Sequence, residues 1–203
     1  REFLATLEEE GQLVRIKEEV MPEPDIGAAG RACANMKEKP AVLFEKVKGY
    51  KYSVVTNVHG SWQNHALMLG MPKNATVKEQ FLESNRRWDK FPVPPTIVSR
   101  EEAKCKENVI TENINLFDIL PLYRINDQDG GFFISKASVV TGDLDEPDNL
   151  DKLNVGTYRI QVKDIDRVGI QALPFHDIAI QLAKAEALNK PLPIAIALGN
   201  SPL

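Results

Sequence analysis

Apolar and polar positions in the first half of the chain follow two periods, that of a helix and that of a strand. Apolar residues in the range 3–7 recur at helical spacing and stop at Gly11, which predicts a short helix with a glycine cap. The ranges 41–47 and 52–58 are rich in β-branched and aromatic residues and predict two strands. Because helices and strands alternate, the pattern predicts an α/β unit.

Polar residues that can cap helices stand before several of the helical segments. Asp25 and Ser61 each precede such a segment and are expected to cap it. Thr76 is followed three residues later by Glu79, the spacing of a capping box, and opens a predicted helix that runs through Trp88.

The composition changes after that helix. Residues 91–95 contain three prolines, which forbid a helix and predict an extended segment. We therefore expect a boundary near there, with an N-terminal α/β domain over 1–108 and a second domain over 109–203. The overall fold class expected is α+β.

The second half predicts mainly strands. The ranges 132–140, 157–163 and 168–173 have strand composition, and 192–198 reads as a buried strand. Between them, 176–188 has one apolar stripe at helical spacing and predicts an amphipathic helix.

Charge and composition exclude several classes of protein. The 203 residues carry 25 basic and 29 acidic side chains, a net charge of −4, with no basic cluster of the kind that binds nucleic acid. The longest uncharged apolar run, 192–198, is too short to cross a membrane, and the N-terminus lacks the features of a signal peptide. The two cysteines, Cys33 and Cys105, have no paired spacing, so we expect neither a disulfide framework nor a zinc cluster, and a reducing cytoplasm.

Candidate chemistry gathers around Asn154. If residues 157–163 form a strand, Arg159 lies on a polar face, and Tyr158 lies on the opposite, apolar face. Gly156 would let the backbone approach a ligand closely. His176 begins the predicted helix, where free N–H groups favour an anion such as phosphate, and an asparagine oxygen with a histidine nitrogen could bind Mg²⁺ or Mn²⁺ there. The pattern alone is also typical of a turn asparagine, a solvated arginine and a capping histidine.

Several longer segments in one order identify a family. The sequence resembles the UbiD-like decarboxylases, which use prenylated flavin mononucleotide to remove CO₂ from aromatic acids, and within them the large C subunits of hydroxyarylic acid decarboxylases. The segments that carry the resemblance are 57–62 (NVHGSW), 115–121 (NLFDILP), 129–132 (DGGF), 154–161 (NVGTYRIQ) and 192–196 (LPIAI).

The resemblance implies a fold and a site. The fold is an N-terminal α/β domain followed by the first part of a split β-barrel that binds flavin. Asn154 and His176 correspond to metal ligands of the family, for Mn²⁺ or Mg²⁺, and K⁺ is a further cation that the resemblance allows. Arg159 corresponds to the catalytic arginine that binds the substrate carboxylate. The residues implied to line the prenylated FMN are Asn154, Thr157, Tyr158, Arg159, Leu173, Phe175 and His176.

The activity implied is reversible, non-oxidative decarboxylation of a phenolic acid such as 4-hydroxybenzoate or vanillate, with CO₂ as the other product. The partners implied are a flavin prenyltransferase (a UbiX-like B subunit), a small D subunit and further copies of the chain, with no nucleic acid and no membrane. The family's third metal ligand and its acidic proton donors correspond to positions after Leu203, so the 203 residues alone are expected to be inactive.

Two alternatives belong to other classes. The first is a truncated flavin-binding or subunit-assembly module without turnover, which the missing later ligands favour. The second is a flavin oxidoreductase, which should carry a nicotinamide-binding G-x-G-x-x-G after a strand, and the sequence has none.

Other candidate positions have structural interpretations. We expect His59 to lie in a turn with Gly60, and His65 to be a structural residue of a helix. Residues 130–131 lack the lysine and hydroxyl of a phosphate loop and predict a turn. The acidic run 143–151 predicts a solvated loop rather than a metal site.

Overall fold

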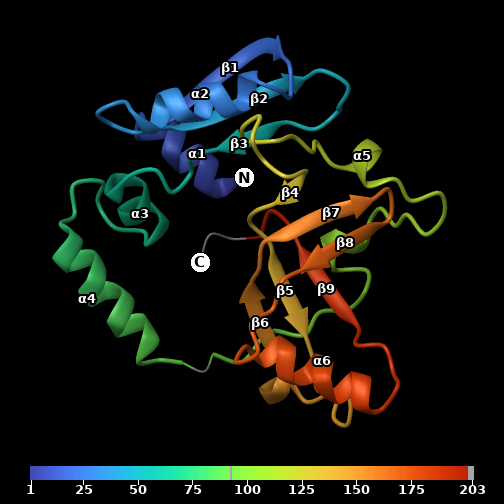
Figure 1. Cartoon of the computed structure of the whole chain (residues 1–203). Helices are drawn as coiled ribbons and strands as arrows, with labels where there is room; N and C mark the ends of the chain where they lie inside the picture. The colour runs from blue at the N-terminus through green and yellow to red at the C-terminus, as the bar shows by residue number, and fades with distance from the viewer. Residues whose placement is uncertain (92, 201–203) are drawn as a thin grey trace. The chain divides into compact units, whose positions relative to one another are not determined.

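The computed structural model describes residues 1–91 and 93–200 (Figure 1). The chain forms two compact units, one that ends at Pro121 and one that begins at Leu122, downstream of the boundary predicted at 108. Each unit is described below by itself. Pro92, within the predicted extended segment, and residues 201–203 lie outside the described residues.

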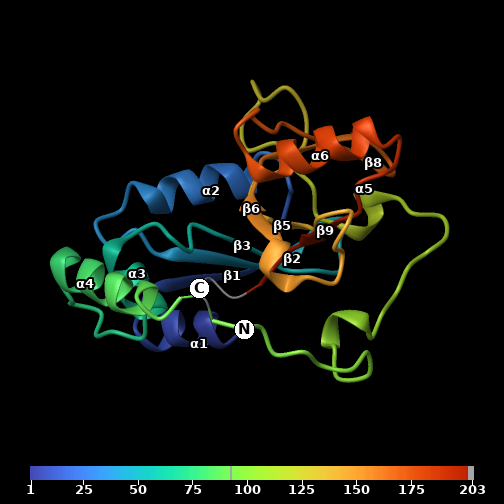
Figure 2. The same cartoon turned by 90° about the horizontal axis from the view of Figure 1, so that it is seen from below.

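The first unit contains a three-stranded sheet in the order β1 (Leu13–Val20), β2 (Ala41–Val47) and β3 (Val54–Thr56). β1 and β2 are parallel, and helix α2 (Asp25–Ala34) makes the crossover between them, while β3 is antiparallel to β2. Figure 2 shows α2 on one face of this sheet, with α1 (Glu2–Glu9) and α3 (Trp62–Met68) on the other. The predicted α/β unit is therefore present.

Helices lie on both faces of this sheet, and its buried residues belong to β2, the central strand. Leu7 of α1 and Leu67 of α3 pack with Ala41 of β2 in one apolar cluster. On the other face α2 lies close to β3. A Cβ added at Gly30 of the helix would be only 3.1 Å from the hydroxyl oxygen of Thr56 in the strand.

The predicted caps were right in two cases and wrong in one. The side chain of Ser61 accepts the Asn64 N–H at the start of α3, and Thr76 and Glu79 form the complete capping box of α4 (Val77–Trp88). Asp25 does not precede α2 but is its first residue, and its carboxylate accepts the Met21 N–H instead. The carboxylate therefore fixes the turn that leads into the helix.

The rest of the first unit has little regular structure. A 3₁₀ turn covers Lys104–Lys106, and a single helical turn, α5, covers Leu116–Ile119.

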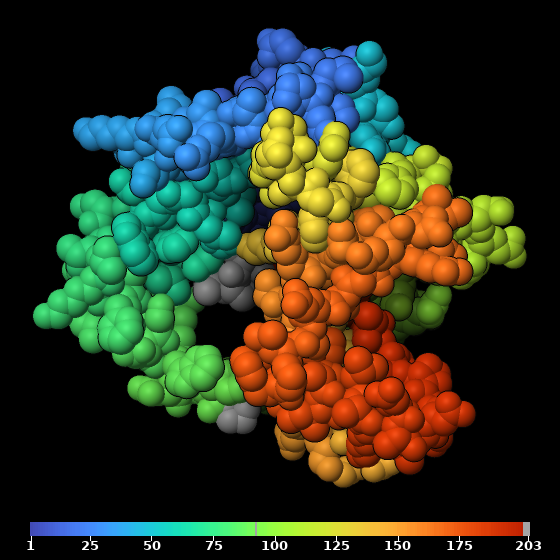
Figure 3. Space-filling view, in the orientation of Figure 1, coloured from blue at the N-terminus to red at the C-terminus, as the bar shows by residue number. Residues whose placement is uncertain are grey.

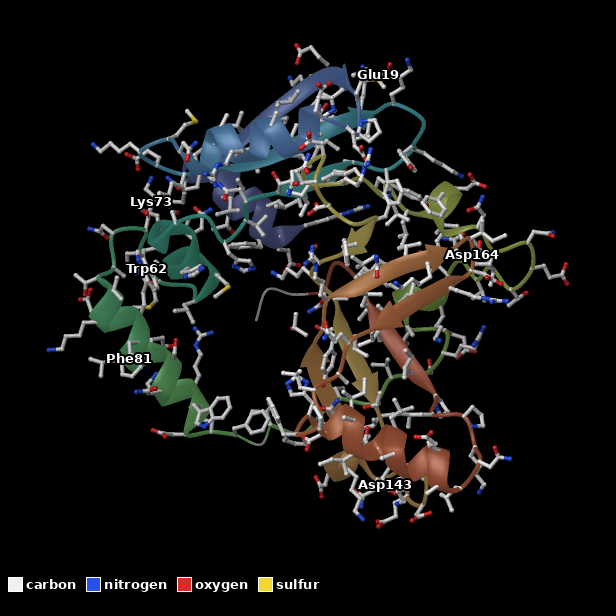
Figure 4. The ribbon with its side chains drawn as sticks, in the orientation of Figure 1. Glu19, Trp62, Lys73, Phe81, Asp143 and Asp164 are labelled. Atoms are coloured by element: carbon white, nitrogen blue, oxygen red, sulfur yellow. The ribbon has the colours of Figure 1, made fainter. Side chains whose placement is uncertain are left out.

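The surface of α4 is visible in Figure 3, and its Phe81, labelled in Figure 4, is 62% exposed. None of the described helices is long and apolar enough to cross a membrane.

The second unit is built from two antiparallel three-stranded sheets. One has the order β4 (Phe133–Ile134), β7 (Ile160–Asp164) and β8 (Arg167–Ile170). The other has the order β6 (Asn154–Thr157), β5 (Ser138–Thr141) and β9 (Ile194–Ala197), and a 3₁₀ turn over Leu150–Lys152 precedes β6. Together with the first unit, these sheets and helix α6 (Asp177–Ala187) make the α+β class expected.

One apolar core joins both sheets to α6. Its buried residues come from β5 and the residue directly before it, from the segment between β6 and β7, from β7 and from the helix: Ala137, Val139, Tyr158, Ile160 and Ile178. The two sheets of this unit therefore share a single interior.

Three strand predictions in this unit need correction. The predicted strand 132–140 is two strands, β4 and β5, and the predicted strand 157–163 is divided between β6 and β7. In both places the chain leaves one sheet and enters the other, a change of partner that local composition does not encode. The strand within 192–198 exists as β9 at the edge of its sheet, but three of its four residues are exposed rather than buried.

Candidate functional site

The side chain of Asn154 is oriented by a neighbour across the sheet. Asn154 opens β6 opposite Thr141, the last residue of β5. Its Nδ2 donates a hydrogen bond to Thr141 Oγ1 over 3.2 Å, and Thr141 is only 2% exposed. Because the amide nitrogen is used inside the unit, the amide oxygen of Asn154 is left as a hydrogen-bond acceptor or metal ligand.

Gly156 lies two residues after Asn154, and the side chain of Tyr158 occupies the space that a side chain at Gly156 would need. A Cβ at Gly156 would lie 2.5–2.7 Å from ring atoms of Tyr158. The missing side chain of Gly156 therefore leaves room for the ring of Tyr158, which follows β6. The Tyr158 ring in turn lies 5.7 Å from the His176 ring, between centroids.

His176 is the N-cap residue of α6, as its position in the sequence predicted. Its side chain makes no capping bond to the helix. Instead Nδ1 accepts the N–H of Leu173 over 3.3 Å, and the ring packs edge-on against Phe175 at 5.0 Å between centroids. An accepting Nδ1 places the proton of the neutral imidazole on Nε2.

Arg159 belongs to a second group of contacts. Its guanidinium carbon lies 3.9 Å from the centroid of the Phe133 ring in β4, a cation–π contact. No carboxylate among the described residues pairs with Arg159, so its N–H groups can still bind an anion. Tyr158 is buried and Arg159 exposed, so the two point to opposite sides as predicted, although both lie between β6 and β7 and not within one strand.

The other residues predicted at the site lie at the surface of this unit. Thr157, at the end of β6, is exposed, and Leu173 and Phe175 are 43% and 75% exposed. The last two leave apolar area uncovered directly before α6. The structure thus brings Gly156, Tyr158 and His176 into contact, whereas Asn154 contacts Thr141 and Arg159 contacts Phe133.

Helix α6 is held to the loop after β5 by ion pairs. Lys184 Nζ lies 2.8 Å from Asp143 Oδ1 and 2.6 Å from Asp145 Oδ2. The hydrogen bond from Lys184 lowers the pKa of the Asp143 carboxyl below its usual value. This loop is the acidic run 143–151, and no cluster of three metal-binding side chains occurs among the described residues.

The chemistry of the donors fits a hard divalent cation. The Asn154 amide oxygen is the kind of ligand that Mg²⁺ and Mn²⁺ prefer, and imidazole is also a ligand of Mn²⁺. His176 presents its lone pair at Nδ1, so metal binding requires either that the cation replace the Leu173 N–H or that the ring change tautomer. The donor atoms of Asn154 and His176 are therefore of the kind that could bind such a cation, and His176 would have to exchange one hydrogen bond to do so.

Thr141 and Phe133 were missed by sequence reasoning. Both act through strand pairing: Thr141 faces Asn154 across β5 and β6, and Phe133 lies opposite Gln161 across β4 and β7. No local signal marks either residue, because each partner is more than ten positions away.

Matches to known families decide the identity. Residues 4–82 match the 3-octaprenyl-4-hydroxybenzoate carboxy-lyase N-terminal domain, and residues 96–203 match the Rift-related domain of the same carboxy-lyase. The chain belongs to the UbiD family.

UbiD-family relatives of known name resemble the whole of this chain. A phenolic acid decarboxylase of Sedimentibacter hydroxybenzoicus is 76% identical over 204 residues, which are 100% of this chain and 42% of that protein. A phenolic acid decarboxylase of Bacillus subtilis is 57% identical, over 100% of this chain and 43% of its own length. The chain thus spans less than half the length of these relatives.

Solved UbiD-class structures agree with the fold. The vanillic acid decarboxylase of Sedimentibacter hydroxybenzoicus, in its closed form, matches with a TM-score of 0.96 and 76% identity over 100% of this chain and 43% of that one. The UbiD-class enzyme HmfF of Pelotomaculum thermopropionicum, in complex with FMN, matches with a TM-score of 0.85 and 37% identity over 100% of this chain and 42% of that one.

Proposed function

We propose that this chain is the N-terminal part of a UbiD-family enzyme that decarboxylates a phenolic acid, such as 4-hydroxybenzoate or vanillate, reversibly and without net oxidation. The enzyme uses prenylated FMN and a divalent metal, Mn²⁺ or Mg²⁺, with K⁺ as a further cation. When bound, the prenylated flavin supplies the electron-accepting chemistry that the departure of CO₂ requires.

The observation that carries this proposal is the orientation of the Asn154 amide. Thr141 accepts from the amide nitrogen, which leaves the oxygen as a ligand for the metal. His176 is the second ligand, at the N-cap of α6, where the N–H groups of the helix and its dipole favour the flavin phosphate. Leu173 and Phe175 supply exposed apolar area for the ring system.

Arg159 is the residue that binds the substrate. A guanidinium can donate two parallel hydrogen bonds to a carboxylate, which a lysine cannot do. The contact with Phe133 restricts where the guanidinium lies and so orients the carboxylate of a phenolic acid. The proton donor and the third metal ligand are assigned to no residue of this chain.

The second unit, with two sheets around one core, is the first part of a split β-barrel in this proposal. The enzyme acts in the cytoplasm as an oligomer of identical chains and receives its cofactor from a separate flavin prenyltransferase. One relative, the Sedimentibacter vanillic acid decarboxylase, is a complex that includes a D protein, and we propose a small subunit of that kind here.

The test is expression of the complete gene together with a flavin prenyltransferase, followed by native mass spectrometry and assays with 4-hydroxybenzoate and vanillate. We expect a subunit that carries prenylated flavin and one divalent metal and that releases CO₂. Flavin and metal retained without turnover of any phenolic acid would favour a binding or assembly module. A protein with neither ligand would refute both functions.

A further inference from the structure

The segment 57–62, one of the most distinctive in the sequence, has no part in the proposed decarboxylase site. It lies in the first unit and runs from the loop after β3 to Trp62, the first residue of α3. We propose that this segment and the loop before β2 form a binding site for a planar aromatic anion, a single-ring carboxylate or phenolate. The proposal does not rest on the decarboxylase function, because every residue it uses belongs to the first unit.

The site is a cavity of about 320 Å³ whose lining includes Lys37, Lys39, His59, Trp62 and His65. Ligand pockets in proteins range over about 300–1,000 Å³, so this cavity suits one aromatic ring better than a nucleotide.

One side of the cavity is formed by aromatic rings. The Trp62 ring packs edge-on against His65 at 5.2 Å, and His65 lies 5.6 Å from His59, between ring centroids. Trp62 is 57% exposed although it is large and apolar, and it is labelled in Figure 4 on α3. A planar ligand that packs against this indole would cover apolar area and add an aromatic contact.

Two lysines supply positive charge to the same cavity. No acidic residue lines the cavity, and neither Lys37 nor Lys39 pairs with a carboxylate among the described residues. Their ammonium groups are therefore left to interact with an anion. Charge next to an aromatic wall is the combination that recognises an aromatic carboxylate or phenolate.

The two loops are fastened to each other through Asn57. Its Nδ2 donates to the carbonyl oxygens of Lys39 at 3.2 Å and Pro40 at 2.7 Å. Asn57 and Lys39 both have positive φ, 57° and 46°, an uncommon backbone conformation that the surrounding contacts must hold. Gly60 lies so close that a Cβ there would be 2.4 Å from the Asn57 amide. The backbone that carries Lys39 is therefore preorganised, which lowers the cost of binding.

The test is isothermal titration of the chain with benzoate. All variants carry Arg159→Ala, which removes binding at the proposed substrate site of the second unit. We expect saturable binding of benzoate that the double variant Lys37→Ala/Lys39→Ala weakens about fivefold, as two exposed charge contacts allow. Trp62→Leu should weaken binding about threefold, the size of one aromatic contact.

Matched controls are available in the same unit. Lys46→Ala/Lys48→Ala removes two lysines at the same spacing outside the cavity lining, and Trp88→Phe changes the other tryptophan. Both should bind benzoate like the parent. Circular dichroism shows whether each variant is folded. If Trp62→Leu proves unstable, a Trp62→Phe variant that binds benzoate about as well as the parent would support the role of an aromatic ring at this position.

Three results would overturn the proposal. The first is unchanged benzoate binding in the double lysine variant. The second is equal affinity for cyclohexanecarboxylate, which has the charge without the aromatic ring. The third is displacement of benzoate by inorganic phosphate at equal concentration, which would make the site a general anion site.

Discussion

The amide of Asn154 donates to the hydroxyl of Thr141 across two paired strands, so a buried threonine sets the direction in which an asparagine oxygen points. Without that acceptor the amide can rotate and present its nitrogen, which does not bind metal ions. Mutation of a residue that hydrogen-bonds to a metal ligand typically lowers metal affinity about 10–100-fold.

The first prediction follows directly. Thr141→Val, which keeps the shape and removes the hydroxyl, should weaken the Mn²⁺-dependent binding of FMN about tenfold. Thr141→Ser should keep it near the parent value, because the hydroxyl is retained. Flavin fluorescence titrated with and without Mn²⁺ measures this, and equal loss in both variants would show a packing effect instead.

The second prediction concerns Arg159. Arg159→Ala in the complete enzyme should lower kcat/KM by about 100-fold or more while FMN still binds, and Arg159→Lys should restore little because it lacks the planar fork. Unchanged turnover would remove the assignment of Arg159 to the substrate.

The third prediction tests the ring beneath that guanidinium. Phe133→Leu keeps an apolar side chain but loses the cation–π contact, which is worth about 0.5–1 kcal/mol at exposed sites. We expect KM for the phenolic acid to rise about two- to fivefold with little change in kcat. The double variant with Arg159→Ala should then show no further loss, and an additive loss would contradict the coupling.

The fourth prediction concerns Gly156. A methyl group there overlaps the Tyr158 ring, so Gly156→Ala should lower the free energy of unfolding by about 1–3 kcal/mol. The smaller side chain of Tyr158→Ala removes the overlap, so adding Gly156→Ala to that variant should cost much less. Urea unfolding of the four proteins in this cycle gives the coupling, and strict additivity would argue against the contact.

The fifth prediction is a pH dependence. Lys184 lowers the pKa of Asp143 in the folded state below its ordinary value of 3.8. The ion pair therefore stabilises the fold fully above that value, and the stabilisation is lost as the pH falls through the lower, folded-state pKa. Asp143→Asn should reduce the loss of stability in acid below about pH 4, measured by thermal unfolding at several pH values. An identical acid profile in the variant would mean that this pair contributes nothing.

Local patterns in the sequence predicted what local physics determines. The capping box at Thr76 and the opposite faces of Tyr158 and Arg159 are encoded within a few residues of each other, and both are present. The contact of His176 with Leu173, three residues before it, is also local, although its chemistry was not anticipated.

Pairing between distant segments could not be read in the same way. The sequence did not indicate that β5 leaves the sheet of β4, so Thr141 and Phe133 were not associated with the site. His59 lies in a turn and His65 in α3, as predicted, but the sequence did not indicate that both line one cavity.

The passage of the chain from β6 to β7 takes place within Tyr158 and Arg159. One peptide bond separates a side chain in the core from the one proposed to meet the substrate. The packing of the interior around Tyr158 therefore constrains the direction of the guanidinium of the next residue. If Arg159 binds the substrate as proposed, a substitution that changes the volume of the core around Tyr158 would alter the direction of the guanidinium, and with it the substrate preference, without touching the pocket.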